Sequence, residues 1–113
     1  MQDCLFCKII EGSIPASIVY EDKDFIVFKD VSPQAEIHLL LVLRQHFATL
    51  AEMTEQQAEL LGVCLKKLAE TAPELGFSDG YRLVVNQGEH AGQTVFHLHV
   101  HILGGRKLSW NPG

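Results

Sequence analysis

The sequence predicts one α+β domain over residues 1–113, and three observations carry this prediction. A chain of 113 residues has the usual length of a single domain. Short β-rich runs bounded by turn residues recur along the chain, and one segment, 54–72, has apolar residues at helical spacing. No repeat and no Gly-, Ser- or Pro-rich linker divides the sequence.

The N-terminal part predicts a short helix, a hairpin and a buried strand. Apolar residues within Cys4–Ile10 recur at spacings of three and four, which favours a helix. The β-rich runs Ile18–Tyr20 and Phe25–Lys29 flank a polar tetrad, so they predict a hairpin. Ile37–Leu43 is apolar almost throughout, which indicates a central strand covered on both faces.

The C-terminal part predicts the one long helix and two more strands. Thr54 and Gln57 have the spacing of a capping box, and apolar residues follow at helical spacing. Tyr81–Val85 and Val95–Leu103 have the composition of strands and are joined by a loop. Residues 104–113 show neither a strand nor a helix pattern and are expected to be extended.

Composition and charge exclude several classes of protein. With 9 Lys and Arg against 14 Asp and Glu, the net charge of −5 argues against binding nucleic acid by neutralising phosphates. No apolar run approaches the roughly 20 residues that cross a bilayer, so no membrane partner is expected. The N-terminus lacks a basic stretch followed by an apolar one, and three cysteines suit a reducing compartment. These features predict a cytoplasmic protein.

Histidines at every second position of the last predicted strand are the main candidates for chemistry. Because side chains alternate along a strand, the rings of His97, His99 and His101 are expected on one face, about 6.6 Å apart. Neutral imidazole, with an unperturbed pKa of about 6.5, serves as nucleophile, base or ligand. The residues alone leave open catalysis, metal binding and plain solvent-facing polarity, although a flat row of three spreads too far for an ideal tetrahedron.

Together with the apolar residues between them, these histidines resemble the signature of the histidine-triad (HIT) family, His-φ-His-φ-His-φ-φ, where φ is apolar. Every position of His97–Leu103 fits this signature. Supporting blocks occur in order along almost the whole chain, at Phe6–Ile10, Ile14–Ala16, Asp30–Ala35, Val84–Asn86, Gly92–Val95 and Leu103–Arg106. The sequence is most similar to the histidine triad nucleotide-binding proteins that act as purine nucleoside phosphoramidases.

The resemblance implies both a fold and a reaction. The fold is HIT-like, with five strands in one antiparallel sheet, one long helix and a short N-terminal helix. The reaction is hydrolysis of nucleoside 5′-phosphoramidates, as in an adenosine 5′-monophosphoramidase, through attack of His99 on the α-phosphorus and a nucleotidyl-histidine that water then cleaves. His97, His101 and His38 complete the implied catalytic set. The family pattern points to the backbone carbonyl of His101 as the acceptor that fixes the tautomer of His99.

The resemblance also implies a site for a purine nucleotide. Asp30 would accept the ribose hydroxyls, Asn86 and the Thr94 hydroxyl would contact the phosphate or leaving group, and backbone N–H groups of Gly92–Val95 would stabilise phosphate charge. Thr94 stands where serine is commoner in this branch. An apolar sleeve around the base discriminates adenine from guanine poorly. Its residues are Leu5, Phe6, Ile9, Phe28 and Val31.

A Cys-x-x-Cys pair predicts a second kind of site. Cys4 and Cys7 are a moderate zinc signal and also have the spacing of a redox pair, although no thioredoxin-like strand precedes them. The resemblance implies a structural zinc held by this pair with His46 and His97. Such a Cys2His2 set is closed, so it suits structure and leaves catalysis without a required cofactor.

Two other functions stay open beside the phosphoramidase. One is a dinucleoside polyphosphate hydrolase or nucleotidylyltransferase of the same superfamily, and the other is a non-enzymatic nucleotide- or zinc-binding interaction module. Gly104–Arg106 followed by Trp110 resembles the phosphoramidase branch. The resemblance further implies a homodimer with the long helix and tails at the seam, but the apolar stripe of 54–72 would equally cover the sheet within one chain.

Overall fold

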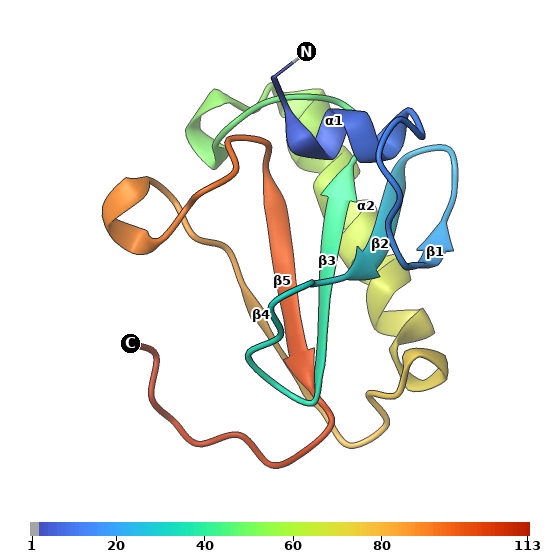
Figure 1. Ribbon diagram of the computed structural model, residues 1–113, viewed down its shortest axis with the longest axis vertical. Helices are drawn as coiled ribbons and strands as arrows, with labels where there is room; N and C mark the ends of the chain where they lie inside the picture. The colour runs from blue at the N-terminus through green and yellow to red at the C-terminus, as the bar shows by residue number, and fades with distance from the viewer. Residues whose placement is uncertain (1–2) are drawn as a thin grey trace.

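The computed structural model describes residues 3–113 and shows one antiparallel sheet with helices on both faces. The sheet order is β1-β2-β3-β5-β4 (Figure 1). The predicted α+β class, the five antiparallel strands, the long helix and the short N-terminal helix are confirmed. The elements are α1 (Leu5–Ile10), β1 (Ile18–Glu21), β2 (Phe25–Lys29), β3 (Ile37–Leu43), α2 (Glu55–Thr71), β4 (Tyr81–Val84) and β5 (His99–Gly104).

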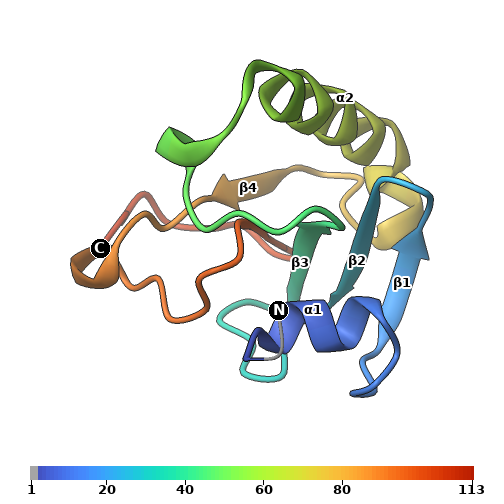
Figure 2. The ribbon, with the colours of Figure 1, turned by 90° about the horizontal axis from the view of Figure 1, so that it is seen from above.

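The sheet separates two apolar layers, with α2 on one face and α1 on the other (Figure 2). Side chains of β3 alternate between them, so that Leu39 and Leu41 join the α2 layer while Leu40 and Val42 join the α1 layer. Ile37–Leu43 is therefore a central strand buried on both faces, as its composition predicts.

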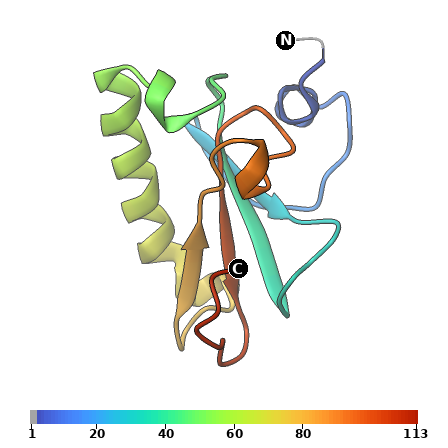
Figure 3. The same ribbon diagram turned by 90° about the vertical axis from the view of Figure 1, so that its left-hand side faces the viewer.

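The long helix packs its apolar stripe against the sheet. Thr54 caps it, accepting from the backbone N–H of Gln57, whose side chain accepts in return from the backbone N–H of Thr54. Leu61, Cys64 and Leu68 are the buried residues of its stripe. The stripe of 54–72 thus covers the sheet within one chain, and α2 lies against one face along its length (Figure 3).

The last strand starts later than its sequence suggests. Val95–Leu103 is predicted as one strand, but β5 begins at His99. Ahead of it the chain leaves the ladder and runs past the end of β3, where the Leu98 N–H donates to the carbonyl of Phe47. Buried Gln93 fixes this turn because its amide donates to the carbonyl of Ala48 and accepts from the N–H of Gly88.

The short helix α1 is held by its surroundings. Six residues are too few for a stable isolated helix, so tertiary contacts must support it. Phe6 and Ile9 are buried against the sheet, and Cys4 is the N-cap, its sulfur accepting from the Cys7 N–H. Both cysteines are thereby placed at the end of α1 that faces the turn before β5.

Short 3₁₀ helices and a C-terminal tail complete the chain. The 3₁₀ helices, which the pattern did not predict, are Leu50–Glu52, Ala72–Leu75 and Glu89–Ala91. After β5 the tail forms neither a helix nor a strand, and Arg82 of β4 donates to the carbonyl of Ser109. Within the described residues, none of the helices has both the length and the apolar character that crossing a membrane requires.

Candidate active site

A groove of about 800 Å³ lies on the α1 face of the sheet. Side chains of β2, β3 and β5 form its floor, and its walls come from α1, the loops after α1 and β2, and the turn before β5. The groove therefore gathers residues from both ends of the sequence. Its lining includes Phe6, Phe28, Asp30, His38, Thr94, Val95, His99 and His101.

Three of the predicted histidines lie next to one another in this groove. The ring centroids of His99 and His101 are 5.0 Å apart, and those of His101 and His38 are 5.1 Å apart. The register of the sheet explains the second contact. Leu40 of β3 is paired with His101, so His38 is the diagonal neighbour of His101 on the same face.

A backbone carbonyl fixes the tautomer of His99. Its Nδ1 is 2.8 Å from the carbonyl oxygen of His97, and because a carbonyl only accepts, Nδ1 carries the proton and donates. The lone pair of the neutral ring is then on Nε2. The prediction that the carbonyl of His101 is the acceptor is wrong. His101 lies in the ladder between Leu40 and Val84, whereas the turn before β5 aims the His97 carbonyl at the His99 ring.

A hydrogen bond from His38 fixes the tautomer of His101. The backbone N–H of Gln34 donates to Nδ1 of His38 at 3.0 Å, so the proton of a neutral His38 is on Nε2. That Nε2 is 2.9 Å from Nδ1 of His101 and 3.3 Å from Oδ2 of Asp30. His101 accordingly accepts at Nδ1 and keeps its own proton on Nε2, which leaves it an N–H donor.

Burial keeps this row of rings neutral. It lowers the pKa of His38 and of His99 below 6.5, the ordinary value for histidine. Burial, with the nearby His99 and His38, lowers the pKa of His101 to about 4. Neutral imidazole at pH 7 supplies both a lone pair at His99 and an N–H donor at His101.

His97 belongs to a different cluster. Its ring is fully buried, and its Nε2 donates to the carbonyl of Leu43 at 2.7 Å, so its lone pair is on Nδ1. That nitrogen faces Cys4, Cys7 and His46 rather than the groove. The prediction that all three rings of the triad share one face is wrong for His97, because the alternation of a strand begins only at His99.

The four side chains of this cluster fit a tetrahedral zinc ion. With Zn–S near 2.3 Å and Zn–N near 2.0–2.1 Å, a tetrahedron places S and N roughly 3.6 Å apart and two N atoms roughly 3.3 Å apart. The Sγ of Cys4 and of Cys7 lie 3.4 and 3.6 Å from Nδ1 of His97. Nδ1 of His46 is 3.3 Å from Sγ of Cys7 and 3.1 Å from Nδ1 of His97. The predicted ligand set is therefore brought together.

A second group of residues of metal-ligand type lacks a free lone pair on one of its nitrogens. Asp30, His38 and His101 have donor atoms within 4.8 Å of one another. However, the Gln34 N–H occupies Nδ1 of His38 and places the proton on Nε2, the nitrogen that would have to bind the metal. The hydrogen bonds of this group suit neutral, metal-free chemistry.

The remaining predicted site residues divide between the groove and its surroundings. Asp30, Thr94 and Val95 line the groove, as do all the residues of the predicted base sleeve, Leu5, Phe6, Ile9, Phe28 and Val31. Phe6 is 4% exposed and Val31 is 97% exposed, so they lie at the bottom and at the rim. Asn86 and Gly92 lie together in the neighbouring loop, outside the lining.

Comparisons with known proteins agree with this geometry. Residues 3–110 match the family model described as "Scavenger mRNA decapping enzyme C-term binding". An uncharacterized HIT-like protein of Synechocystis sp. is 52% identical over 112 residues, which are 99% of this chain and 98% of that protein. The crystal structure of a HIT family hydrolase from Legionella pneumophila has a TM-score of 0.92 and 46% identity, covering 98% of this chain and 100% of that one.

This chain belongs to the HIT family. A zinc-bound histidine triad family protein from Mycobacterium smegmatis is similar to it as well, with a TM-score of 0.81 and 33% identity over 96% of this chain and 81% of that one. The family and the HIT-like fold are thus as the triad signature indicates, and its relatives include hydrolases.

Some functional groups of this HIT protein carry little sequence signal. The N–H of Gln34 and the carbonyls of Leu43 and His97 orient three histidine rings. Almost any residue type supplies such main-chain groups, so the sequence does not identify them. Gln93 is the exception, as an amide beside Gly92 in a block shared with the family. Its 2% exposure shows that it holds the loop rather than contacts a ligand.

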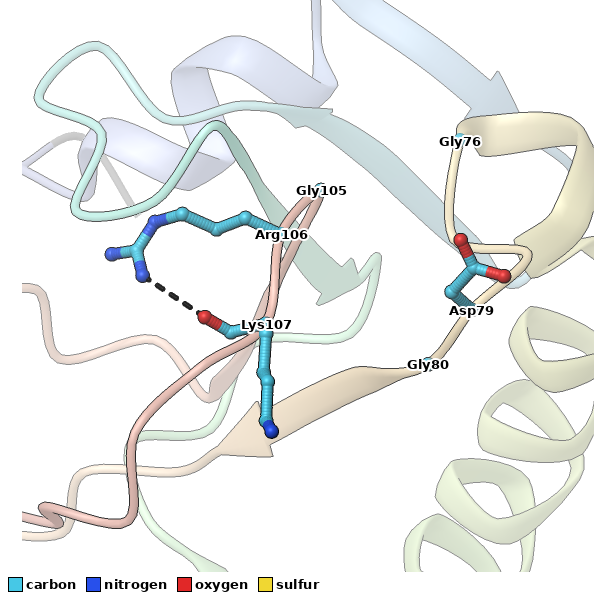
Figure 4. Close-up of a pocket in the computed structure, with 6 residues that line it drawn as sticks. All are labelled: Gly76, Asp79, Gly80, Gly105, Arg106 and Lys107. Carbon is cyan, nitrogen blue, oxygen red and sulfur yellow. Dashed lines mark hydrogen bonds between the residues drawn. The ribbon is translucent and has the colours of Figure 1, made fainter.

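A further hollow of this HIT protein lies away from the triad, between the turn before β4 and the chain after β5 (Figure 4). It measures about 320 Å³. The guanidinium of Arg106 turns away from Asp79 and donates to the carbonyl of Lys107 (Figure 4). None of the predicted site residues lies in it, so the chemistry is assigned to the larger groove.

Proposed function

We propose that this HIT protein hydrolyses purine nucleoside 5′-phosphoramidates, with His99 as the nucleophile. The observation that carries the proposal is the His99 Nδ1–H donated to a backbone carbonyl. This leaves Nε2 as a lone pair on a buried, neutral ring in a groove large enough for a nucleotide.

His99 would attack the α-phosphorus through Nε2. The P–N bond to the amine breaks as the N–P bond to His99 forms, and the leaving amine takes up a proton from solvent, which the water of the second step returns. Water then attacks the same phosphorus, releasing the nucleoside monophosphate and the free ring. Two easier displacements thus replace one difficult one.

His101 and His38 have supporting roles in this proposal. Because His101 accepts from His38, its Nε2–H is available to a phosphate oxygen as charge develops there. His38 acts on His101 and not on the phosphate, so it is a positioning residue. His97, predicted as catalytic, is assigned instead to the metal cluster and to the tautomer of His99.

The rest of the groove suits a nucleotide. The buried rings of Phe6 and Phe28 offer an apolar slot for a purine. Asp30, with its side chain 17% exposed, would accept ribose hydroxyls. Thr94 and Val95, before β5, supply a hydroxyl and backbone N–H groups for phosphate, and Asn86 and Gly92 shape that loop.

We further propose a structural zinc at Cys4, Cys7, His46 and His97. Bound there, it would cross-link α1 to two other segments. Burial raises the pKa of the Cys7 thiol to about 11, so binding must displace that proton. The free cysteines that this site needs suit the cytoplasm, which we infer as the location.

A homodimer is part of the proposal too. β4 is an edge strand, and the register pairs Leu83 with Ile102, which places Leu83 on the α2 face. Leu83 is 41% exposed there, and Val63 of α2 is 59% exposed. These apolar side chains, next to an unpaired strand edge, suit a second copy of the chain.

The test is the adduct at His99. Mass spectrometry of the protein quenched during turnover of an adenosine 5′-phosphoramidate should find adenylate on His99. His99→Asn should show no adduct and no turnover while it still binds AMP by calorimetry. Equal steady-state rates for His99→Asn and parent would remove His99 from its role, and cleavage confined to dinucleoside polyphosphates would move the protein to the other class of hydrolase.

A further inference from the structure

One residue links the metal cluster to the catalytic groove. The ring of His97 is in the cluster, and its backbone carbonyl accepts the hydrogen bond that fixes the tautomer of His99. The ring and the carbonyl are parts of one residue in a turn outside the strand ladder. A change in the position of the ring is therefore expected to change the position of the carbonyl.

Hydrogen bonds hold the turn that carries His97 on the sides away from the metal cluster. The N–H of Leu98 and the Nε2–H of His97 tie it to the Phe47 and Leu43 carbonyls, and the buried amide of Gln93 holds its start. The Nδ1 atom of the His97 ring faces ligand atoms, namely Nδ1 of His46 and the sulfurs of Cys4 and Cys7. Without a metal, the cluster consists of two imidazole nitrogens and two thiol sulfurs within 4.8 Å of one another.

A second contact joins the same two sites. Phe6 lies between the two cysteines in the sequence, and its ring meets the His99 ring edge-on, with centroids 5.0 Å apart and an interplanar angle of 89°. The Phe6 ring is also 6.1 Å from the His97 ring. The cysteines thus fix the helix turn whose side chain packs against the nucleophile.

We propose that a metal ion bound by Cys4, Cys7, His46 and His97 selects the tautomer of His99 by holding the His97 carbonyl in place. This inference rests on the proposed function only in so far as His99 is the nucleophile. The metal-loaded protein keeps His99 in the Nδ1–H form, with Nε2 free to attack. In the metal-free protein the carbonyl moves, and His99 exchanges between its two neutral tautomers.

Ring ¹⁵N spectra of the full chain test the coupling directly, since the two nitrogens of each histidine report its tautomer. The zinc-loaded protein is expected to show His99 as the Nδ1–H form alone, and the chelator-treated protein a mixture. His101 is the internal reference, because its tautomer depends on His38 and should stay Nε2–H in both samples.

Two variants of one ligand make the test specific. His46→Ala removes a ligand that lies outside the main groove, and should give the mixed tautomer together with a loss of turnover of about 10- to 100-fold. AMP affinity should change by less than about threefold, since a positioning defect appears in kcat. His46→Cys restores a fourth ligand and should restore the single tautomer. His90→Ala, an exposed histidine, is the matched control.

Three results would overturn the coupling. The first is His99 remaining in the Nδ1–H form after the metal is removed. The second is simultaneous loss of the His101 signal, which would mean general unfolding. The third is no thiolate-to-metal absorption on adding Co²⁺, which would mean that the cluster binds no metal. None of these readouts needs turnover, so a protein inactive on every phosphoramidate would refute the proposed function without touching this result.

Discussion

Hydrogen bonds to the main chain give three histidines of this HIT protein different chemistry. The carbonyl of His97 makes His99 a donor at Nδ1, and the N–H of Gln34 makes His38 an acceptor at Nδ1. The carbonyl of Leu43 makes His97 a donor at Nε2. Rings of the same type thus serve as proposed nucleophile, positioning residue and metal ligand because their neighbours differ.

The low pKa of His101 predicts a pH dependence of stability. Its pKa is about 4 in the folded protein, through burial and the nearby His99 and His38, against 6.5 for an ordinary histidine. Between these values the unfolded chain binds a proton that the folded protein does not. The free energy of unfolding should therefore fall as the pH drops from 6.5 towards about 4.

Urea denaturation of parent and His101→Asn across this range measures the effect. The variant should lose part of the pH dependence, because asparagine does not titrate. Histidine signals of the urea-unfolded chain give the reference titration. Identical pH dependence in the two proteins would show that His101 is not the group responsible.

Among the elements, α1 and α2 are stabilised in different ways. α2 has its own capping box and a stripe that covers the sheet. α1 has six residues, and its N-cap is a cysteine of the metal cluster. The short helix therefore depends on tertiary contacts, and the proposed metal is expected to stabilise it more than α2.

The capping box of α2 should contribute to stability without touching the groove. Thr54→Ala removes the side chain that accepts from the Gln57 N–H and should lower the free energy of unfolding by about 1 kcal/mol. AMP binding should be unchanged, because α2 is on the opposite face of the sheet. Urea denaturation and calorimetry provide the two measurements.

Thr71→Ala at the other end of α2 is the matched control. The Thr71 hydroxyl donates to the carbonyl of Lys67, a bond that the helix does not need, so its loss should cost less than about 0.5 kcal/mol. Equal losses for the two variants would show that the box has no special role.

Over the whole molecule, the larger part of the core and the candidate groove lie on opposite faces of the sheet. Leu68 and Leu41 belong to the layer under α2, while His38 and His101 lie on the α1 face with the groove. One face of the sheet is thus free for a ligand while the other buries most of the core. β4 is an edge strand of this sheet, and the proposed dimer would form there.

The proposed dimer has a direct test in Leu83. Sedimentation equilibrium should give twice the chain mass of 12.6 kDa for the parent. Leu83→Arg places a charge on the exposed α2-face side of β4 and should give a single chain. Leu50→Arg, at another exposed leucine, is the control and should stay dimeric. A parent that sediments as one chain would contradict the dimer.

The sequence alone determined the elements whose patterns are local. Thr54 and Gln57 mark the start of α2, and the apolar run of Ile37–Leu43 marks a strand buried on both faces, because each pattern is formed by residues close together in the sequence. The spacing of the triad predicted the HIT family, and it predicted His99 and His101 as residues of the site. These predictions needed no knowledge of distant contacts.

Only the tertiary structure decided what His97 does and which carbonyl holds His99. The turn before β5 is set by contacts with Phe47 and Ala48, about half the chain away in sequence, and periodicity does not record such contacts. Main-chain donors and acceptors are the same in every residue, so their direction follows from the fold. The sequence therefore gives the positions of the histidines, whereas the packing of the fold sets the tautomer and the partners of each ring.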